Sequence, residues 1–144
     1  MNEQYVDDFS GWITQTVQLL REQRWQEIDV PNLIEEVEAL GKRDRRGIAS
    51  QLTRLLLHLL KWQYQPQRRS DSWLDSITDA RTQIELAIED SPSLMNYPEE
   101  QIARSYERAR RQAAQQKNME LLVFPATCPY AVDLVLSENW LPED

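Results

Sequence analysis

The chain of 144 residues has little of what several specialised protein classes require. It contains one cysteine and three glycines. The lone cysteine, Cys128, cannot form an internal disulfide, and no paired metal-ligand motif surrounds it, which favours a reducing compartment. So few glycines exclude a collagen-like chain and argue against a glycine-rich nucleotide-binding loop. We therefore expect a cytoplasmic protein and predict no cofactor and no metal motif.

The chain also lacks a long apolar run. The richest stretch, Leu55–Leu60, is interrupted by His58 and followed by Lys61, whereas a membrane-spanning helix needs roughly 18 or more apolar residues in succession. The first residues are acidic where a secretory signal would be basic. These two absences predict a soluble protein that has no membrane partner.

What the sequence does have is helical periodicity. Apolar residues recur at steps of three and four, and strand-like alternation is missing. The pattern predicts helices over residues 8–23, 31–41, 45–64, 71–90 and from 98 onward, and a short one near 129–137. Asp29 is expected to cap the second of these helices, and Ser70 or Asp71 the fourth. Gly41 follows an apolar stripe as a helix-ending glycine does, which predicts a bend or tight turn at 41–44; residues 31–64 are then one bent helix or two. The fold class is all-α: one domain, residues 1–144, forming a bundle of about five main helices with a C-terminal helical tail.

Charge alternates along the chain. The net charge of −8 comes from 24 acidic and 16 basic residues. Residues 1–40, 41–69, 70–100, 101–117 and 118–144 carry net charges of −7, +7, −7, +4 and −5. Either neighbouring helices pair acidic with basic flanks, or the two basic blocks form a patch for an anionic partner. The candidate anion-binding residues in these blocks are Arg45, Arg46, Arg108 and Arg111.

One set of side chains has the composition of a catalytic site. Glu35, Glu38 and His58 are residue types that can hold a divalent metal or act as a general base. They would meet if a turn at Gly41 folded two helices together. The alternative is structural, because Glu38 and Lys42 form a favourable i,i+4 pair and a single histidine commonly bonds a neighbouring backbone group. We favour the structural interpretation.

Two further groups of candidate residues lie near the end of the central helix. Arg68 and Arg69 follow Pro66, and they could clamp a phosphate or carboxylate or tie back to nearby glutamates. The aromatic residues Trp62, Tyr64 and Trp73 could stack a base or sugar, although side chains at helical spacing more often belong to the core.

Several short strings along the chain act together as a signature. They are Asn32–Glu36 with Glu38 and Leu40-Gly41, His58–Pro66, Arg68–Ser70 with Ser72-Trp73, Asp90–Leu94, Phe124-Pro125 and Cys128–Tyr130. Together they resemble a bacterial family, domain-of-unknown-function family 29, over essentially the whole chain. The resemblance implies a small, all-helical bacterial protein, and it implies no reaction.

These observations favour a non-enzymatic protein-interaction or regulatory module. Its expected partner is another protein or a second copy of the chain, bound through a surplus apolar face of the central helix. One alternative is a metal-assisted hydrolase or nuclease that uses Glu35, Glu38 and His58. The other is a binder of nucleic acid or phosphate through the basic helix flanks, which the overall acidity makes the weaker hypothesis.

Overall fold

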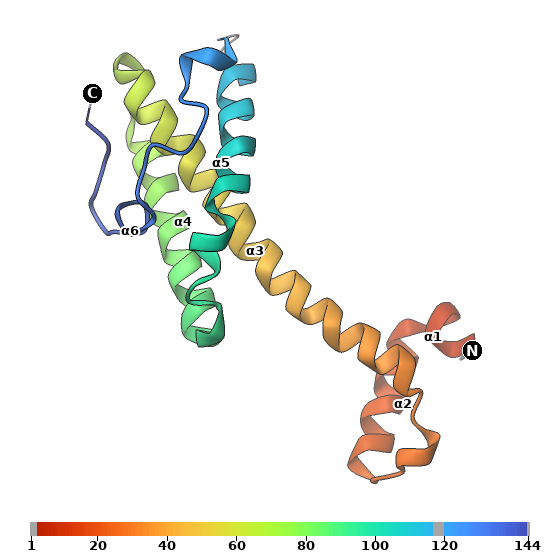
Figure 1. The fold of residues 1–144 in the computed structure, drawn as a ribbon. Coiled ribbons are helices and arrows are strands. Elements are labelled where there is room, and N and C mark those ends of the chain that lie inside the picture. Colours follow the sequence, from red (N-terminus) through yellow and green to blue (C-terminus); the bar gives the residue numbers. More distant parts are fainter. Residues whose placement is uncertain (1–2, 117–119, 144) are drawn as a thin grey trace. The chain divides into compact units, whose positions relative to one another are not determined.

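The computed structural model describes residues 3–116 and 120–143, and they divide into two compact units, residues 1–43 and 44–144. The elements are helical throughout the described residues (Figure 1). The single domain inferred from the length stays a prediction. The helices are α1 (Glu3–Asp7), α2 (Phe9–Arg21), α3 (Val30–Tyr64), α4 (Asp71–Asp90), α5 (Tyr97–Gln116) and α6 (Val132–Val135).

Unit 1 is a helical hairpin formed by α2 and the first part of α3, with α1 packed beside it. Local capping sets both helix starts. Asp8 accepts a hydrogen bond from the amide of Gly11 at 3.0 Å, and Asp29 accepts one from the amide of Asn32 at 3.4 Å. Carboxylates are favourable there because helix N-termini carry unpaired N–H groups and partial positive charge. The predicted cap at Asp29 is thereby confirmed.

Of the bend or tight turn predicted at residues 41–44, the turn is wrong. Helix α3 runs without interruption through this segment, and none of the glycines in the described residues adopts a positive φ. A helix-ending glycine requires that left-handed conformation. The lysine and the three arginines that follow Gly41 are good helix formers, and one glycine costs only about 1 kcal/mol in a helix interior. Of the two alternatives for residues 31–64, one helix is therefore the one observed, and the described residues form four long helices where about five were expected.

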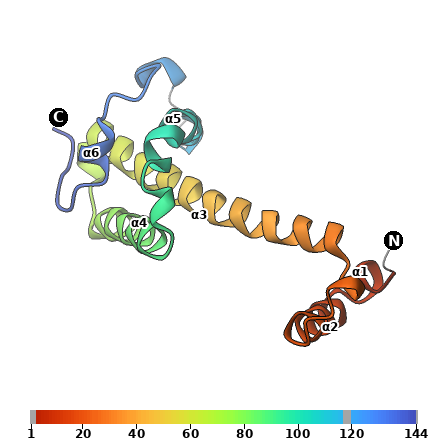
Figure 2. The same ribbon diagram turned by 60° about the horizontal axis from the view of Figure 1, so that its bottom comes forward.

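Unit 2 is a helical bundle in which α4 and α5 lie alongside the C-terminal half of α3 (Figures 1 and 2). The core of this unit takes side chains from all three helices and from the C-terminal segment. Ser70, one of the two caps that the sequence predicted, caps α4 by accepting from the amide of Trp73 at 3.3 Å. The leucines in the C-terminal half of α3 are buried, and the largest enclosed side chains include Ile48, Leu52, Leu55, Leu56, Leu59, Leu60, Ile77, Ile84, Tyr106 and Phe124.

The C-terminal segment is held on unit 2 by hydrogen bonds to its backbone carbonyls. The hydroxyl of Tyr106 donates to Pro125 at 2.6 Å, and Nη2 of Arg110 donates to Phe124 at 3.1 Å. Burial raises the pKa of Tyr106 to about 12, so the hydroxyl keeps its proton at ordinary pH. The C-terminal helix, α6, is shorter than the predicted 129–137. Within the described residues, no helix combines the length and the apolar character needed to cross a bilayer.

Replacing Gly47 with alanine should stabilise unit 2. Gly47 lies inside α3, and a Cβ atom built on it has no heavy atom within 4 Å. Alanine restricts the unfolded chain without a clash, so Gly47→Ala should raise the free energy of unfolding by about 0.5–1 kcal/mol. Chemical denaturation measures the change. In contrast, Gly11→Ala should destabilise the protein, because its Cβ would collide with the capping carboxylate of Asp8. Equal effects of the two substitutions would contradict this account.

Candidate functional site

Unit 1 carries an apolar groove between its two helices. The cavity measures about 270 Å³. Residues spaced three or four apart on each helix line it, because that spacing returns side chains to the same face of a helix. The lining residues are Phe9, Trp12, Ile13, Thr16, Val17 and Leu20 from α2, and Leu33, Glu36, Val37, Leu40 and Arg43 from α3.

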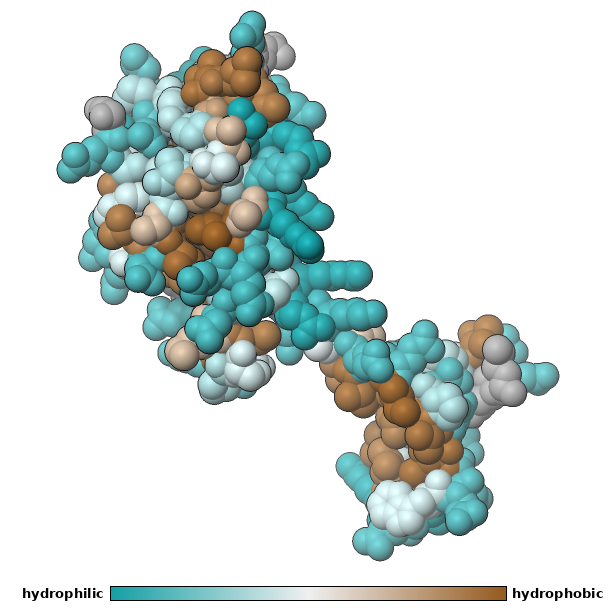
Figure 3. All heavy atoms as spheres, viewed as in Figure 1, coloured by the Kyte–Doolittle hydropathy of each residue, from teal (hydrophilic) through white to brown (hydrophobic). Residues whose placement is uncertain are grey.

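The apolar surface extends beyond the groove. Eight large apolar side chains are each between 37 % and 59 % exposed, and Figure 3 shows apolar surface along these N-terminal helices. We call these eight residues the hairpin face. They are Phe9, Ile13, Val17 and Leu20 on α2, and Val30, Ile34, Val37 and Leu40 on α3.

Little of unit 1 is enclosed beneath this face. Among described residues 3–43, Trp12 and Thr16 fall in the buried class. The indole N–H of Trp12 is buried and finds no acceptor among the described residues. Tyr5 and Phe9 pack against the same indole ring, at 4.8 and 5.9 Å between ring centroids. The hairpin is therefore a thin layer, open on one side.

The acidic residues of unit 1 are largely engaged within the unit. Glu36 accepts the hydroxyl of Tyr5 at 2.5 Å, and this hydrogen bond raises the pKa of Tyr5 to about 12. Glu27 accepts from Arg24, and the guanidinium lowers the pKa of that carboxyl. Asp8 and Asp29 are the helix caps. Much of the negative charge in residues 1–40 thus serves local structure and does not crowd the hairpin face.

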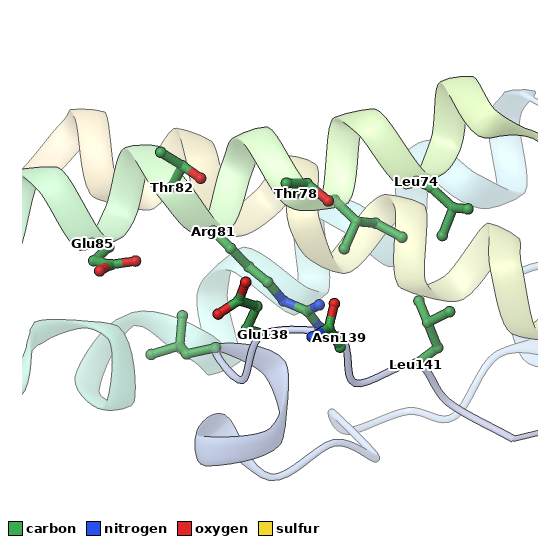
Figure 4. A pocket seen from close by; sticks show the side chains of 10 residues that line it. Leu74, Thr78, Arg81, Thr82, Glu85, Glu138, Asn139 and Leu141 are labelled. Atoms are coloured by element: carbon green, nitrogen blue, oxygen red, sulfur yellow. The ribbon is translucent and has the colours of Figure 1, made fainter.

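Unit 2 has a pocket of about 260 Å³ between α4 and the C-terminal segment. Arg81 reaches across it, toward Glu138 and Asn139 (Figure 4). Its Nε donates to the carbonyl of Val135 at 2.8 Å, and its Nη2 donates to that of Trp140 at 2.7 Å. Burial lowers the pKa of Arg81 below its usual value. Because two of its donors are satisfied by backbone carbonyls, Arg81 has a structural role: it holds the C-terminal segment against α4.

The three catalytic candidates are divided between the units. Glu35 and Glu38 lie in unit 1 and His58 lies in unit 2, all on α3. His58 has its Nδ1 2.8 Å from the carbonyl of Arg54 in the preceding turn, so this nitrogen carries the proton and donates. Burial lowers the pKa of His58. The described residues contain no group of three or more histidine, cysteine or acidic side chains placed to hold a metal ion.

Two of the candidates at the end of α3, Tyr64 and Arg69, contact other residues of the chain. Arg69 donates from Nε to the carbonyl of Trp62 at 2.8 Å and lies over the indole ring, 4.9 Å from its centroid. Arg68 is exposed on the short 3-10 turn Pro66–Arg68. Tyr64 packs edge-on against Phe124 at 5.1 Å. Tyr64 thus packs against the core, as its helical spacing favoured, and Arg69 packs on Trp62, a contact that the sequence did not predict.

The remaining aromatic and basic candidates lie on partly or fully exposed positions. Trp73 is half-buried, with the ammonium of Lys61 5.8 Å from its ring centroid. Arg111 pairs with Glu107 one turn earlier, at 2.8 Å. Arg45, Arg46 and Arg108 are exposed. Arg108 lines a shallow groove together with Arg54.

Arg54 illustrates the pairing of opposite charge blocks. It lies in the basic block on α3 and contacts Asp79 in the acidic block on α4, at 2.6 Å. The guanidinium lowers the pKa of Asp79. This contact is what the helix-pairing explanation of the alternating blocks expected. The pair is substantially exposed, so it contributes little stability.

Sequence reasoning missed the hairpin face and Arg81. It placed the surplus apolar face on the central helix at residues 45–64, but that arc is buried inside unit 2. The signal for the hairpin face was present in the apolar spacing of α2 and of Val30 to Leu40. The sequence could also have pointed to Arg81, because it is the only basic residue in the acidic block 70–100.

The fold and these surfaces define an all-helical protein with an open apolar hairpin and a closed helical bundle. A family model described as "Domain of unknown function DUF29" matches residues 4–141. The chain therefore belongs to the DUF29 family, as the sequence strings indicated. No curated protein and no solved structure matches it.

The single histidine permits a clean pH test. With its folded pKa below the usual 6.5, His58 binds a proton more readily in the unfolded chain. Stability should therefore fall as pH drops through about 6.5, and this contribution should level off below the folded pKa. Proton NMR of the imidazole gives that pKa directly. In His58→Gln, which can still donate to Arg54, this part of the pH dependence should vanish; an imidazole titrating above 6.5 would contradict the assignment.

Removing the guanidinium of Arg81 should loosen the C-terminal segment. Charged hydrogen bonds contribute about 1.5–3 kcal/mol each, and Arg81→Met removes two. The amides of Val135, Leu136 and Trp140 should then exchange hydrogen at least about tenfold faster, as measured by NMR. Arg81→Lys should give an intermediate effect, since a single ammonium cannot reproduce the guanidinium fork. Unchanged amide hydrogen exchange in Arg81→Met would contradict this structural role of Arg81.

Proposed function

We propose that this protein is a non-enzymatic interaction module that binds another protein chain through the hairpin face. The observation that carries the proposal is the set of eight large apolar side chains left 37–59 % exposed on a unit of 43 residues. Soluble monomers rarely expose a contiguous apolar patch of more than a few hundred Å² unless it binds something.

The size of the face supports binding of a protein. A fully exposed large apolar residue presents roughly 150–200 Å², so the eight together leave about 600–700 Å² open. At about 25 cal/mol per Å², covering this area yields about 15 kcal/mol before the costs of association. Those costs are of order 4–15 kcal/mol. The face can therefore support a stable complex, and its width across two helices suits a helical partner.

A photoreactive amino acid in place of Val37 should capture the partner covalently. Val37 is 59 % exposed at the centre of the hairpin face, so a bound chain would lie within reach of the probe. The matched control places the same probe at Leu86, which is 48 % exposed on α4 in unit 2. Irradiation in cells, followed by mass spectrometry, should give protein adducts at position 37 and few at position 86. Equal yields at the two positions, or none at 37, would contradict the proposal.

A further inference from the structure

We propose that the partner of the hairpin face is a second copy of this chain, and that two hairpins pair face to face as a four-helix bundle. The inference rests on the proposed function and deepens it by naming the occupant. It starts from the incompleteness of unit 1. Among described residues 3–43, one large side chain, Trp12, is buried. Units of about 40 residues seldom bury enough surface to be stable without a staple or oligomerisation.

The width of the face favours a partner with two helices. The groove runs between α2 and α3, and a single helix laid into it would cover the lining residues. Val30 and Ile34 do not line that groove, yet they are 48 % and 52 % exposed and share the helical face of Val37. A second hairpin presents a layer of the same width, with its own two helices and the same apolar spacing. Two such layers form the standard core of a four-helix bundle.

The area also matches what a stable dimer needs. The hairpin face offers about 600–700 Å² of apolar surface per chain, and a standard stable interface buries about 800 Å² per partner once polar margins are included. A two-fold pairing uses the same patch on both chains. Each copy would then complete the other's core.

The charges around the face permit this pairing despite the net acidity of residues 1–40. Among the eight face residues none is charged, and the charged residues that line the groove, Glu36 and Arg43, have opposite signs. By helical spacing, Arg21 flanks the face on α2 while Glu38 and Lys42 flank it on α3. All three are exposed. Two copies therefore meet without a concentration of like charge at the contact.

The test is the mass of the purified full-length chain in solution. Sedimentation over about 1–100 μM should give twice the 17.0 kDa of one chain. Val37→Glu and Ile13→Glu, one on each helix of the face, should each weaken the dimer by roughly 100-fold, because each would bury an unpaired carboxylate. Both positions are solvent-exposed in the single chain, and circular dichroism should show that helix content is retained. Leu86→Glu in unit 2 is the matched control and should leave the dimer constant unchanged.

The outcomes separate this inference from the proposed function. If the wild-type chain stays monomeric over the whole range while the probe at position 37 captures a different protein, the partner is not a second copy. That result contradicts the dimer and supports the proposed interaction module. A monomer with no capture at position 37 overturns both. A dimer that resists Val37→Glu and Ile13→Glu but is broken by Leu86→Glu overturns the proposed contact, because the chains would then associate through unit 2.

Discussion

Both units depend on how one helix, α3, meets its neighbours. Its C-terminal half carries leucines on so much of its circumference that α4, α5 and the C-terminal segment are all required to cover them, and the structure buries Leu52, Leu55 and Leu59 completely. Its N-terminal half carries a narrower apolar stripe, and α2 covers only part of it. Val37 and Leu40 remain more than half exposed. The same helix therefore takes part in a closed core in unit 2 and in an open layer in unit 1.

This contrast explains which features the sequence could predict. Helix starts depend on local chemistry, so the cap at Asp29, the cap at Ser70 or Asp71, and the all-α class were predicted correctly. The break at Gly41 was not, because a helix-ending glycine and an interior glycine differ only in backbone conformation. A periodic apolar stripe does not reveal whether a neighbour covers it, so the sequence placed the surplus face at 45–64, where the structure buries it.

The roles of the arginine side chains could not be predicted either. Residue type alone could not decide whether an arginine binds a ligand or ties the chain together. Arg69 and Arg81 both direct donors to backbone carbonyls of the chain itself. The contacts of Arg81 are long-range in sequence, because the two carbonyls belong to residues 54 and 59 positions further along the chain. No local pattern encodes that separation.

Order and association in unit 1 are coupled in the dimer that we propose. Ordering a residue costs about 1–2 kcal/mol of backbone entropy, and the hairpin encloses little besides Trp12 and Thr16 to offset that cost. Covering the hairpin face supplies the missing apolar burial, so the ordered hairpin is stabilised by whatever binds it. Unit 2, with its own enclosed core, carries no such requirement. The stability of the hairpin should therefore follow the concentration of the chain, whereas the stability of the bundle should not.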